Sequence, residues 1–116
     1  MKKKIPKKIE KSIAEFLEGA NKMFGDRAKK IILYGSYARG DFDKSSDIDI
    51  MILTDFTDEE IVEYSERIWD FAYDIELEND VLISPLIKNI DKFNYWLEAL
   101  PFYMNVQKEG VVLHGT

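Results

Sequence analysis

The sequence predicts an α/β (α+β) domain, a small mixed β-sheet with helices packed mainly on one side of it. Apolar, β-branched-rich runs at residues 31–33 and 48–53 have the composition of strands, and residues 9–24 and 57–79 have helical periodicity. Strand-like and helical stretches that alternate along a chain are typical of α/β folds. The length of 116 residues suits one domain, 1–116, with a single core.

Composition excludes several classes of protein. Apolar residues make up 46% of the chain, which is typical of a folded domain, and without cysteine there is no disulfide framework or thiolate metal site. No apolar run approaches the roughly 18 residues of a membrane span. The lysine-rich N-terminus lacks the apolar stretch of a signal peptide. We therefore expect a cytoplasmic protein without a membrane partner.

Charge is distributed unevenly along the chain. The net charge is −6, but residues 1–11 carry six lysines and one acid, which leaves −11 for the remainder. Such an acidic body argues against nucleic acid as a partner, because nucleic-acid affinity comes mostly from phosphate neutralisation. Residues 1–8 are expected to form a basic, flexible arm. Contact of this arm with RNA or an acidic partner is the alternative to a merely solvated chain end.

The first helix is predicted from one apolar stripe, and Gly25 is its expected end. The stripe consists of Ile9, Ile13, Phe16, Leu17, Ala20 and Met23. A strand at residues 31–33 follows and ends at Gly35-Ser36, after which residues 37–39 are expected to form one helical turn that Gly40 closes.

The second strand begins with two aspartates, Asp47 and Asp49. Side chains two residues apart on a strand share a face, so both carboxylates point the same way while Ile48 and Ile50 point into the core. Two carboxylates on one rigid face repel each other unless a cation or a proton lies between them. Mg²⁺ prefers oxygen ligands of this kind, often one or two carboxylates together with substrate phosphates.

The turn before this strand is suited to phosphate. Gly35 has no Cβ, so a polyphosphate can approach the backbone closely. Ser36 adds a hydroxyl group, and the amides after it can point at an anion if a helix starts there. One edge of the expected site therefore binds phosphate, and the other binds the metal that neutralises it.

Two neighbouring residues have two readings each. Arg39 either reaches a substrate phosphate or pins the loop by pairing with Asp41, Asp43 or Asp47. Ser46 either contacts the nucleotide or, the favoured reading, braces the turn before Asp47.

The second half of the chain contains a capping box, Thr57 to Glu60, which opens a long acidic helix to about Asn79. A third strand is expected at residues 81–86, where Pro85 marks an edge or an end. Asp91 is expected to cap a short helix, Pro101 to start another that runs to Gly110, and residues 111–113 to form a short strand or extended tail.

Gly35-Ser36, Ala38-Arg39-Gly40 and Ser46-Asp47-Ile48-Asp49, in this order and spacing, resemble the signature of the DNA polymerase β-type nucleotidyltransferase superfamily. The short chain and the form GSYARGD…SDIDI are most similar to the minimal nucleotidyltransferases, the partners of HEPN toxins in prokaryotic toxin–antitoxin pairs. The resemblance implies the polymerase β-type fold and two Mg²⁺ ions held by Asp47 and Asp49. It also implies ATP or another NTP bound at Gly35, Ser36, Arg39 and Ser46.

The resemblance is incomplete at the third carboxylate, which in the superfamily lies on the next central strand and can act as general base. The expected third strand has no carboxylate in its interior, and Asp80 at its start is the one candidate. Loss of a general base costs about 10²–10⁴-fold in rate.

Three functions follow from these observations. The first is transfer of AMP from ATP to a hydroxyl group of a partner HEPN toxin, with Asp80 as base. The second is a nucleotide-binding antitoxin that acts by covering its partner, which would use the apolar C-terminal segment with Trp96, Phe102, Tyr103 and Met104. The ordinary core of a small domain is the simpler reading of those side chains. A transferase acting on nucleic acid ranks last, and a homo- or hetero-oligomer is compatible with the first two functions.

Overall fold

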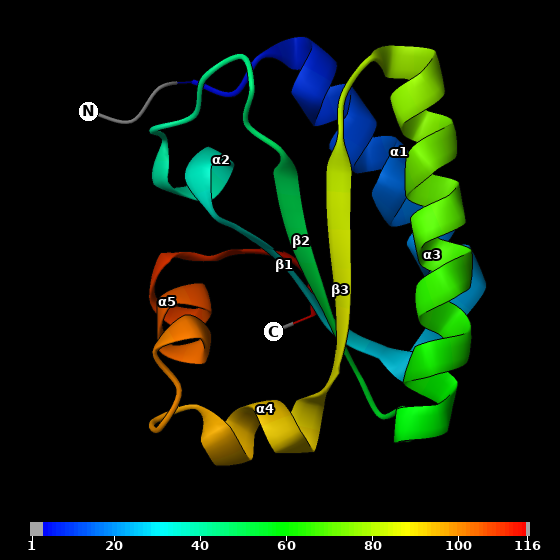
Figure 1. Cartoon of the computed structure of the whole chain (residues 1–116), viewed down its shortest axis with the longest axis vertical. Helices are drawn as coiled ribbons and strands as arrows, with labels where there is room; N and C mark the ends of the chain where they lie inside the picture. The colour runs from blue at the N-terminus through cyan, green and yellow to red at the C-terminus, as the bar shows by residue number, and fades with distance from the viewer. Residues whose placement is uncertain (1–3, 116) are drawn as a thin grey trace.

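A computed structural model describes residues 4–115 and shows a four-stranded mixed sheet between two layers of helices (Figure 1). In chain order the elements are α1 (Lys7–Phe24), the 3₁₀ helix η1 (Gly25–Arg27), β1 (Ala28–Tyr34), α2 (Ser36–Arg39), β2 (Ile48–Thr54), α3 (Asp58–Asn79), β3 (Ile83–Asn89), α4 (Ile90–Trp96), α5 (Pro101–Glu109) and β4 (Val111–His114).

The strand order is β3-β2-β1-β4. β1 is antiparallel to both β2 and β4, whereas β2 and β3 are parallel and joined by α3. β2 therefore lies inside the sheet, and its alternation matches the prediction, because Ile48 and Ile50 are fully buried while Asp49 between them is partly exposed.

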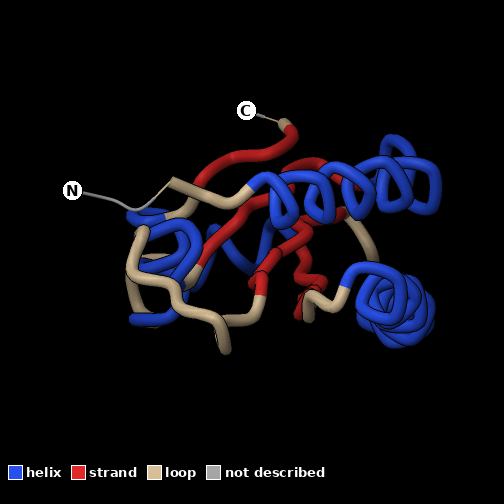
Figure 2. The backbone as a smooth tube through the Cα atoms, turned by 90° about the horizontal axis from the view of Figure 1, so that it is seen from above, coloured by secondary structure: helices blue, strands red, loops and turns tan. Residues whose placement is uncertain are grey.

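The two long helices cover one face of the sheet, as Figure 2 shows from above. Phe16 of α1 and Ile68 of α3 are fully buried in one cluster with Ile31, Ile50 and Ile83 of the sheet. The helical stripe predicted for the first helix is thus confirmed as a core face.

The opposite face carries a smaller core. Ile32, Met51 and Leu53 point to this side and pack with Phe93 of α4 and Val106 of α5. The prediction of helices mainly on one side holds for the long helices, and two short ones cover part of the other face. This arrangement matters for the site, because Asp49 alternates to the same side as Met51 and Leu53.

α3 begins at the predicted capping box. The Thr57 hydroxyl accepts a hydrogen bond from the Glu60 amide at 3.2 Å, and the Glu60 carboxylate accepts one from the Thr57 amide at 3.0 Å. Glu60 also accepts two hydrogen bonds from the Arg27 guanidinium, at 3.0 and 3.1 Å. The start of α3 is therefore joined to the segment before β1.

Several boundaries differ from the prediction, and β1 begins at Ala28, three residues before the predicted start. β3 begins at Ile83, not at residue 81, and continues to Asn89, because Asp80 takes a left-handed conformation (φ 55°) that ends α3. Asn89 caps α4 in place of Asp91, since its side chain accepts a hydrogen bond from the Lys92 amide at 3.0 Å. Lys7 and Lys8, expected in the flexible arm, are helical, because the Pro6 carbonyl accepts the first hydrogen bonds of α1. Residues 1–3 of that arm lie outside the described residues.

Between residues 4 and 115 the helices are either too short or too polar to pass through a lipid bilayer.

Candidate functional site

The predicted turn connects β1 to α2 and is formed by a glycine with positive φ. Gly35 has φ 78° and ψ −155°, a conformation that side chains with a Cβ rarely adopt. Ser36 follows as the first residue of α2, a single helical turn that ends at the left-handed Gly40. This confirms the predicted turn, the helical turn and its end.

Asp49 lies directly against Gly35. A Cβ on Gly35 would overlap the Oδ2 atom of Asp49. The aspartate reaches this position because β1 and β2 are antiparallel neighbours, with Tyr34 opposite Asp49 in the register. The turn at Gly35 and one of the two aspartates therefore meet as the sequence predicted, in a hollow that exists because Gly35 has no side chain.

The electrostatics of this hollow favour a cation. Burial raises the pKa of the Asp49 carboxyl above its ordinary value, and the negative charge of Asp47 raises it further, while Arg39 opposes both effects. Two coupled carboxylates, one of them half-buried, form a donor set of hard oxygen atoms. The set fits Mg²⁺, which prefers such ligands and can share them with phosphate oxygens.

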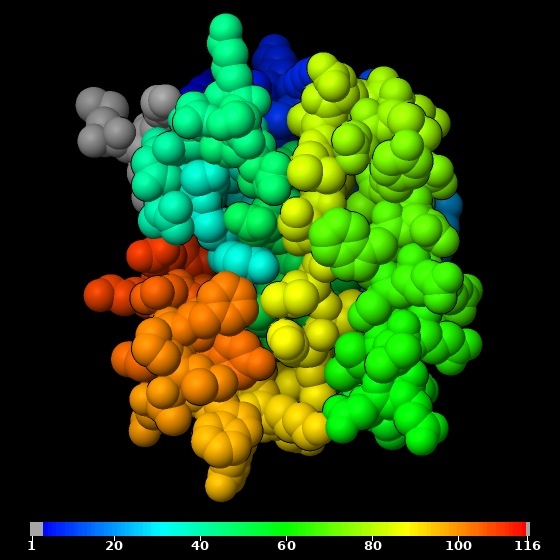
Figure 3. All heavy atoms as spheres, viewed as in Figure 1, coloured from blue at the N-terminus to red at the C-terminus, as the bar shows by residue number. Residues whose placement is uncertain are grey.

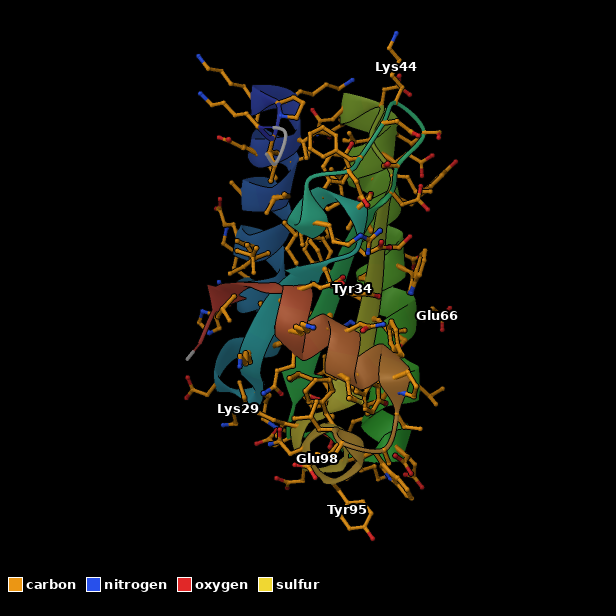
Figure 4. All side chains as sticks on the ribbon, turned by 90° about the vertical axis from the view of Figure 1, so that its left-hand side faces the viewer. Lys29, Tyr34, Lys44, Glu66, Tyr95 and Glu98 are labelled. Carbon is orange, nitrogen blue, oxygen red and sulfur yellow. The ribbon has the colours of Figure 1, made fainter. Side chains whose placement is uncertain are left out.

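Two cavities adjoin the aspartates. The first has a volume of about 530 Å³ and lies between the end of β1, α2 and α5. It is lined by Tyr34, Gly35, Ser36, Arg39, Asp49, Phe102, Asn105, Val106 and Glu109. Figure 4 shows Tyr34 between α2 and α5, on the side of the molecule that carries this cavity. Gly35, Ser36 and Arg39 thus share one cavity with Asp49, whereas Ser46, the fourth predicted nucleotide-binding residue, lines the other cavity.

The second cavity, of about 690 Å³, lies between the loop before β2, the start of α1 and the end of α3. Asp47 and Asp80 both line it, together with Tyr37 and Phe42. Phe42 is buried and stacks on Tyr37 at 4.6 Å between ring centroids, so it is a packing residue at the wall of this cavity. Burial raises the pKa of the Tyr37 hydroxyl, and the charges of Asp43 and Asp47 add to this effect.

Arg39 pins the loop and also contacts α5. Its guanidinium pairs with Asp41 at 3.1 Å and with Glu109 at 3.5 Å. The hydrogen bond that the guanidinium donates to Asp41, together with the negative charges of Asp41 and Glu109, raises the pKa of Arg39. Of the two readings, pairing with Asp41 is present in the structure. Glu109 had not been predicted as a partner.

Ser46 stabilises the loop before Asp47, which was the favoured of its two predicted roles. Its hydroxyl accepts a hydrogen bond from the Asp43 amide at 2.9 Å, and Asp43 in turn accepts hydrogen bonds from the amide and hydroxyl of Ser45. The loop that delivers Asp47 to β2 is therefore held by its own side chains.

Asp80 does not lie on a strand, contrary to the prediction. It follows α3 as the left-handed residue at the helix end and is exposed. The strand position beside Asp49 is occupied by Ser84, its register partner on β3, so the third strand brings a hydroxyl group and not a carboxylate to the site. Among residues 4–115 no three acidic or histidine side chains are grouped so that they could hold a metal ion.

Sequence reasoning missed the contribution of α5. Phe102 packs edge-to-face on Tyr34 with ring centroids 5.6 Å apart, and Asn105 and Glu109 line the same cavity. Burial, followed by the charge of Asp49, raises the pKa of Tyr34 to about 12. No local sequence pattern predicts these contacts, because α5 is more than 60 residues from the turn at Gly35 in the chain. The aromatic residues near the C-terminus were the available signal in the sequence.

Comparisons with known proteins identify the family of the chain. A family model described as "Nucleotidyltransferase domain" matches residues 13–113. "Putative protein adenylyltransferase MJ0604" of Methanocaldococcus jannaschii is 36% identical over 105 residues, which cover 90% of this chain and 97% of the relative. A second protein of the same organism, "Putative protein adenylyltransferase MJ0141", is 37% identical over 65% of this chain and 74% of its own.

Solved structures with the same fold come from toxin–antitoxin complexes. A crystal structure of a toxin–antitoxin with AMP-PNP aligns with a TM-score of 0.55 and 22% identity, over 92% of this chain and 73% of that chain. A mutant of the toxin–antitoxin MntA–HpeT aligns with a TM-score of 0.54 and 20% identity, over 92% and 73% of the two chains. At this identity the likeness establishes the fold.

Proposed function

The chain belongs to the nucleotidyltransferase domain family of enzymes, and on this premise we propose that it transfers AMP from ATP, with Mg²⁺, to a hydroxyl group of a partner toxin protein. The observation that carries the proposal is the contact of Asp49 with the side-chain-free surface of Gly35. It supports a site in which a metal ligand and a phosphate-binding turn face the same bound group.

The donor nucleotide is proposed to lie in the cavity between α2 and α5. The Ser36 hydroxyl and the amides at the start of α2 bind the β- and γ-phosphates, and Arg39 exchanges an acidic partner for a phosphate oxygen. Asp47 and Asp49 hold Mg²⁺, which neutralises charge on the phosphates when it is bound. Ser46 keeps Asp47 in place through the loop and stays a candidate for nucleotide contact.

The reaction is an in-line displacement. The acceptor oxygen forms a bond to the α-phosphorus, the bond from that phosphorus to the bridging oxygen of the β-phosphate breaks, and pyrophosphate leaves. The proton of the acceptor hydroxyl goes to a base, for which we propose Asp80, because it lines the same cavity as Asp47.

The base assignment is tested by Asp80→Asn. As a base, Asp80 supports a rate advantage of about 10²–10⁴-fold, so kcat falls by that factor with little change in KM for ATP. Glu78→Gln, an exposed acid near the same helix end, is the control. Equal kcat values for the two variants would exclude Asp80 as base.

For the acceptor we propose a tyrosine hydroxyl on a HEPN-type toxin. The two relatives are named as protein adenylyltransferases, and the structural neighbours are toxin–antitoxin complexes, one of them with AMP-PNP. AMP on that tyrosine would silence the toxin, which makes this chain an antitoxin.

The test is incubation of the purified protein with α-labelled ATP, MgCl₂ and the product of the adjacent toxin gene. Label is expected on the toxin with the wild-type protein and is expected to be absent with Asp47→Asn/Asp49→Asn. Circular dichroism of the double variant checks that it folds. If no divalent metal supports label transfer, the proposal is wrong.

A second candidate function is a nucleotide-binding antitoxin with weak or no catalysis. Ser84 favours it, because a hydroxyl group lies beside Asp49 on the third strand, where the resemblance leads us to expect a carboxylate. If the double aspartate variant still neutralises the toxin in cells, this second function is the correct one.

A further inference from the structure

Four large apolar side chains lie in line on the solvent side of α3. Val62, Trp69, Tyr73 and Leu77 are 74%, 46%, 56% and 67% exposed. Steps of seven, four and four residues keep them on one face of a helix. We call these four residues the α3 stripe. Such a line of exposed apolar side chains indicates an interaction surface.

The α3 stripe is not an extension of the core. The core face of α3 is formed by Ile68, Ala72 and Ile75, which are buried against α1 and the sheet. By the helical angle of 100° per residue, the stripe is centred about 130° around the helix axis from these three. None of its residues lines either cavity next to Asp47 or Asp49. Figure 3 shows that α3 forms a continuous part of one surface of the molecule, beside β3.

The surroundings of the stripe are strongly acidic. α3 contains nine Asp and Glu residues and one basic residue, Arg67. The Arg67 guanidinium lies over the Tyr64 ring at 4.9 Å, away from the line of the stripe. Glu63, Glu66, Asp70 and Asp74 are exposed beside the apolar side chains. The surface therefore combines an apolar centre with a negative border.

The charge pattern around the α3 stripe indicates which kind of partner binds there. A second copy of the chain would bring the same four exposed acids against this face, and like charges at an interface cost several kcal/mol. A lysine- or arginine-flanked apolar surface would gain both burial and charge complementarity. We propose that the α3 stripe binds an amphipathic helix of a partner protein, with basic residues on both sides of its apolar line.

The geometry sets the size of the partner helix. From Val62 to Leu77 the stripe extends over about 22 Å, at 1.5 Å per residue, so a helix of about 16 residues matches it. Glu66 occupies the one position in the line without an apolar side chain, and Figure 4 shows it directed away from the body of the molecule. The partner helix is expected to place a lysine or arginine opposite Glu66.

The proposal concerns binding and does not rest on the transfer reaction. The probe is a fluorescently labelled 18-residue helical peptide with a leucine line and lysine flanks. A second peptide has the same leucine line and glutamate flanks, and a third has the lysine flanks with serine in place of leucine. Fluorescence anisotropy at low and at physiological salt gives Kd for the wild-type protein and its variants.

The first peptide is expected to bind at least tenfold more tightly than the other two. Val62→Ser/Leu77→Ser and Glu66→Lys are each expected to weaken it by at least tenfold. These are surface changes on side chains that are mostly exposed, so the fold is expected to persist, which circular dichroism checks. Tyr95→Ser, at a 77% exposed residue of α4, is the matched control and should bind as the wild type does.

Two results would overturn the proposal. One is equal binding of the lysine-flanked peptides with leucine and with serine lines, which would reduce the effect to charge alone. The other is a dimer in size-exclusion chromatography with light scattering that Val62→Ser/Leu77→Ser dissociates, because a second copy would then occupy the stripe.

Discussion

At the scale of single residues, the site depends on the missing side chain of Gly35. Gly35→Ala places a Cβ on the Asp49 Oδ2 atom and strains a backbone with φ 78°. We expect a loss of about 1–3 kcal/mol in the free energy of unfolding and a loss of AMP transfer. Urea unfolding and the labelled-ATP assay measure the two effects.

Gly25→Ala separates strain from steric overlap. Gly25 also has positive φ, 53°, but a Cβ there meets nothing within 4 Å. We expect this variant to lose about 1 kcal/mol of stability and to keep its activity. Equal activity losses in the two variants would show that the contact between Gly35 and Asp49 has no special role.

Asp49 is a residue at which function and stability oppose each other. Because burial and Asp47 raise its pKa, the folded state favours the protonated carboxyl. The stability that the proton provides is present below the ordinary pKa of 3.8 and is lost as the pH rises through the raised value. At pH 7 the ionised Asp49 therefore destabilises the metal-free protein.

We expect Asp49→Asn to raise the melting temperature of the metal-free protein at pH 7 and to abolish AMP transfer. The gain should shrink as the pH falls through the raised pKa of Asp49 toward 3.8, because wild-type Asp49 becomes protonated over this range. Differential scanning fluorimetry in EDTA between pH 3 and pH 8 measures it, with the exposed Asp26→Asn as control. A lower melting temperature at pH 7 would contradict the electrostatic account.

At the scale of elements, α5 places an acidic side chain beside Arg39. Glu109 at the end of α5 pairs with Arg39 from α2 at 3.5 Å, so a phosphate oxygen must compete with this carboxylate. Exposed pairs contribute about 0.2–1 kcal/mol, which corresponds to at most about fivefold in binding. We expect Glu109→Gln to lower KM for ATP by about two- to fivefold at low salt.

The effect should become smaller at high salt, because salt screens both the pair and its competitor. Glu98→Gln removes an exposed acid from the segment between α4 and α5 and serves as control. An unchanged KM in Glu109→Gln at low salt would mean that Arg39 does not bind the donor phosphates.

The elements with strong local signals were predictable. Gly25 and Gly40 end α1 and α2 as predicted, and Thr57 with Glu60 starts α3, because these caps depend on neighbours within four residues. The start of β3 was not predictable in the same way. Asp80 adopts the left-handed conformation that ends α3, and the apolar residues after it read as a strand although they form a connection.

At the scale of the whole molecule, the sequence predicted half of the site. Gly35 and Asp49 could be placed together because two short strands on either side of one loop form an antiparallel pair. Phe102, Asn105 and Glu109 could not, because the position of α5 depends on how Val106 packs on Ile32 and Met51, which are distant in sequence. Tertiary packing of α5 closes the cavity, and no local sequence pattern predicts that packing.

The complete site should be detectable as a thermodynamic linkage between folding and ligand. A ligand that binds only the folded state at a concentration of 100 times its Kd stabilises it by about 2.7 kcal/mol. For a domain of this size this corresponds to a rise of about 10 °C in the melting temperature. We expect this rise with MgCl₂ and a non-hydrolysable ATP analogue together.

Each component alone should do much less. Mg²⁺ alone lacks the phosphate oxygens that complete its coordination, and the analogue in EDTA carries its charge toward Asp47 and Asp49 without a cation between them. Asp47→Asn/Asp49→Asn should remove the dependence on Mg²⁺ but can retain a small shift through Ser36 and Arg39. An equal shift with and without Mg²⁺ in the wild type would mean that the two aspartates bind no metal, and the site would then be a phosphate-binding turn beside an unrelated acidic pair.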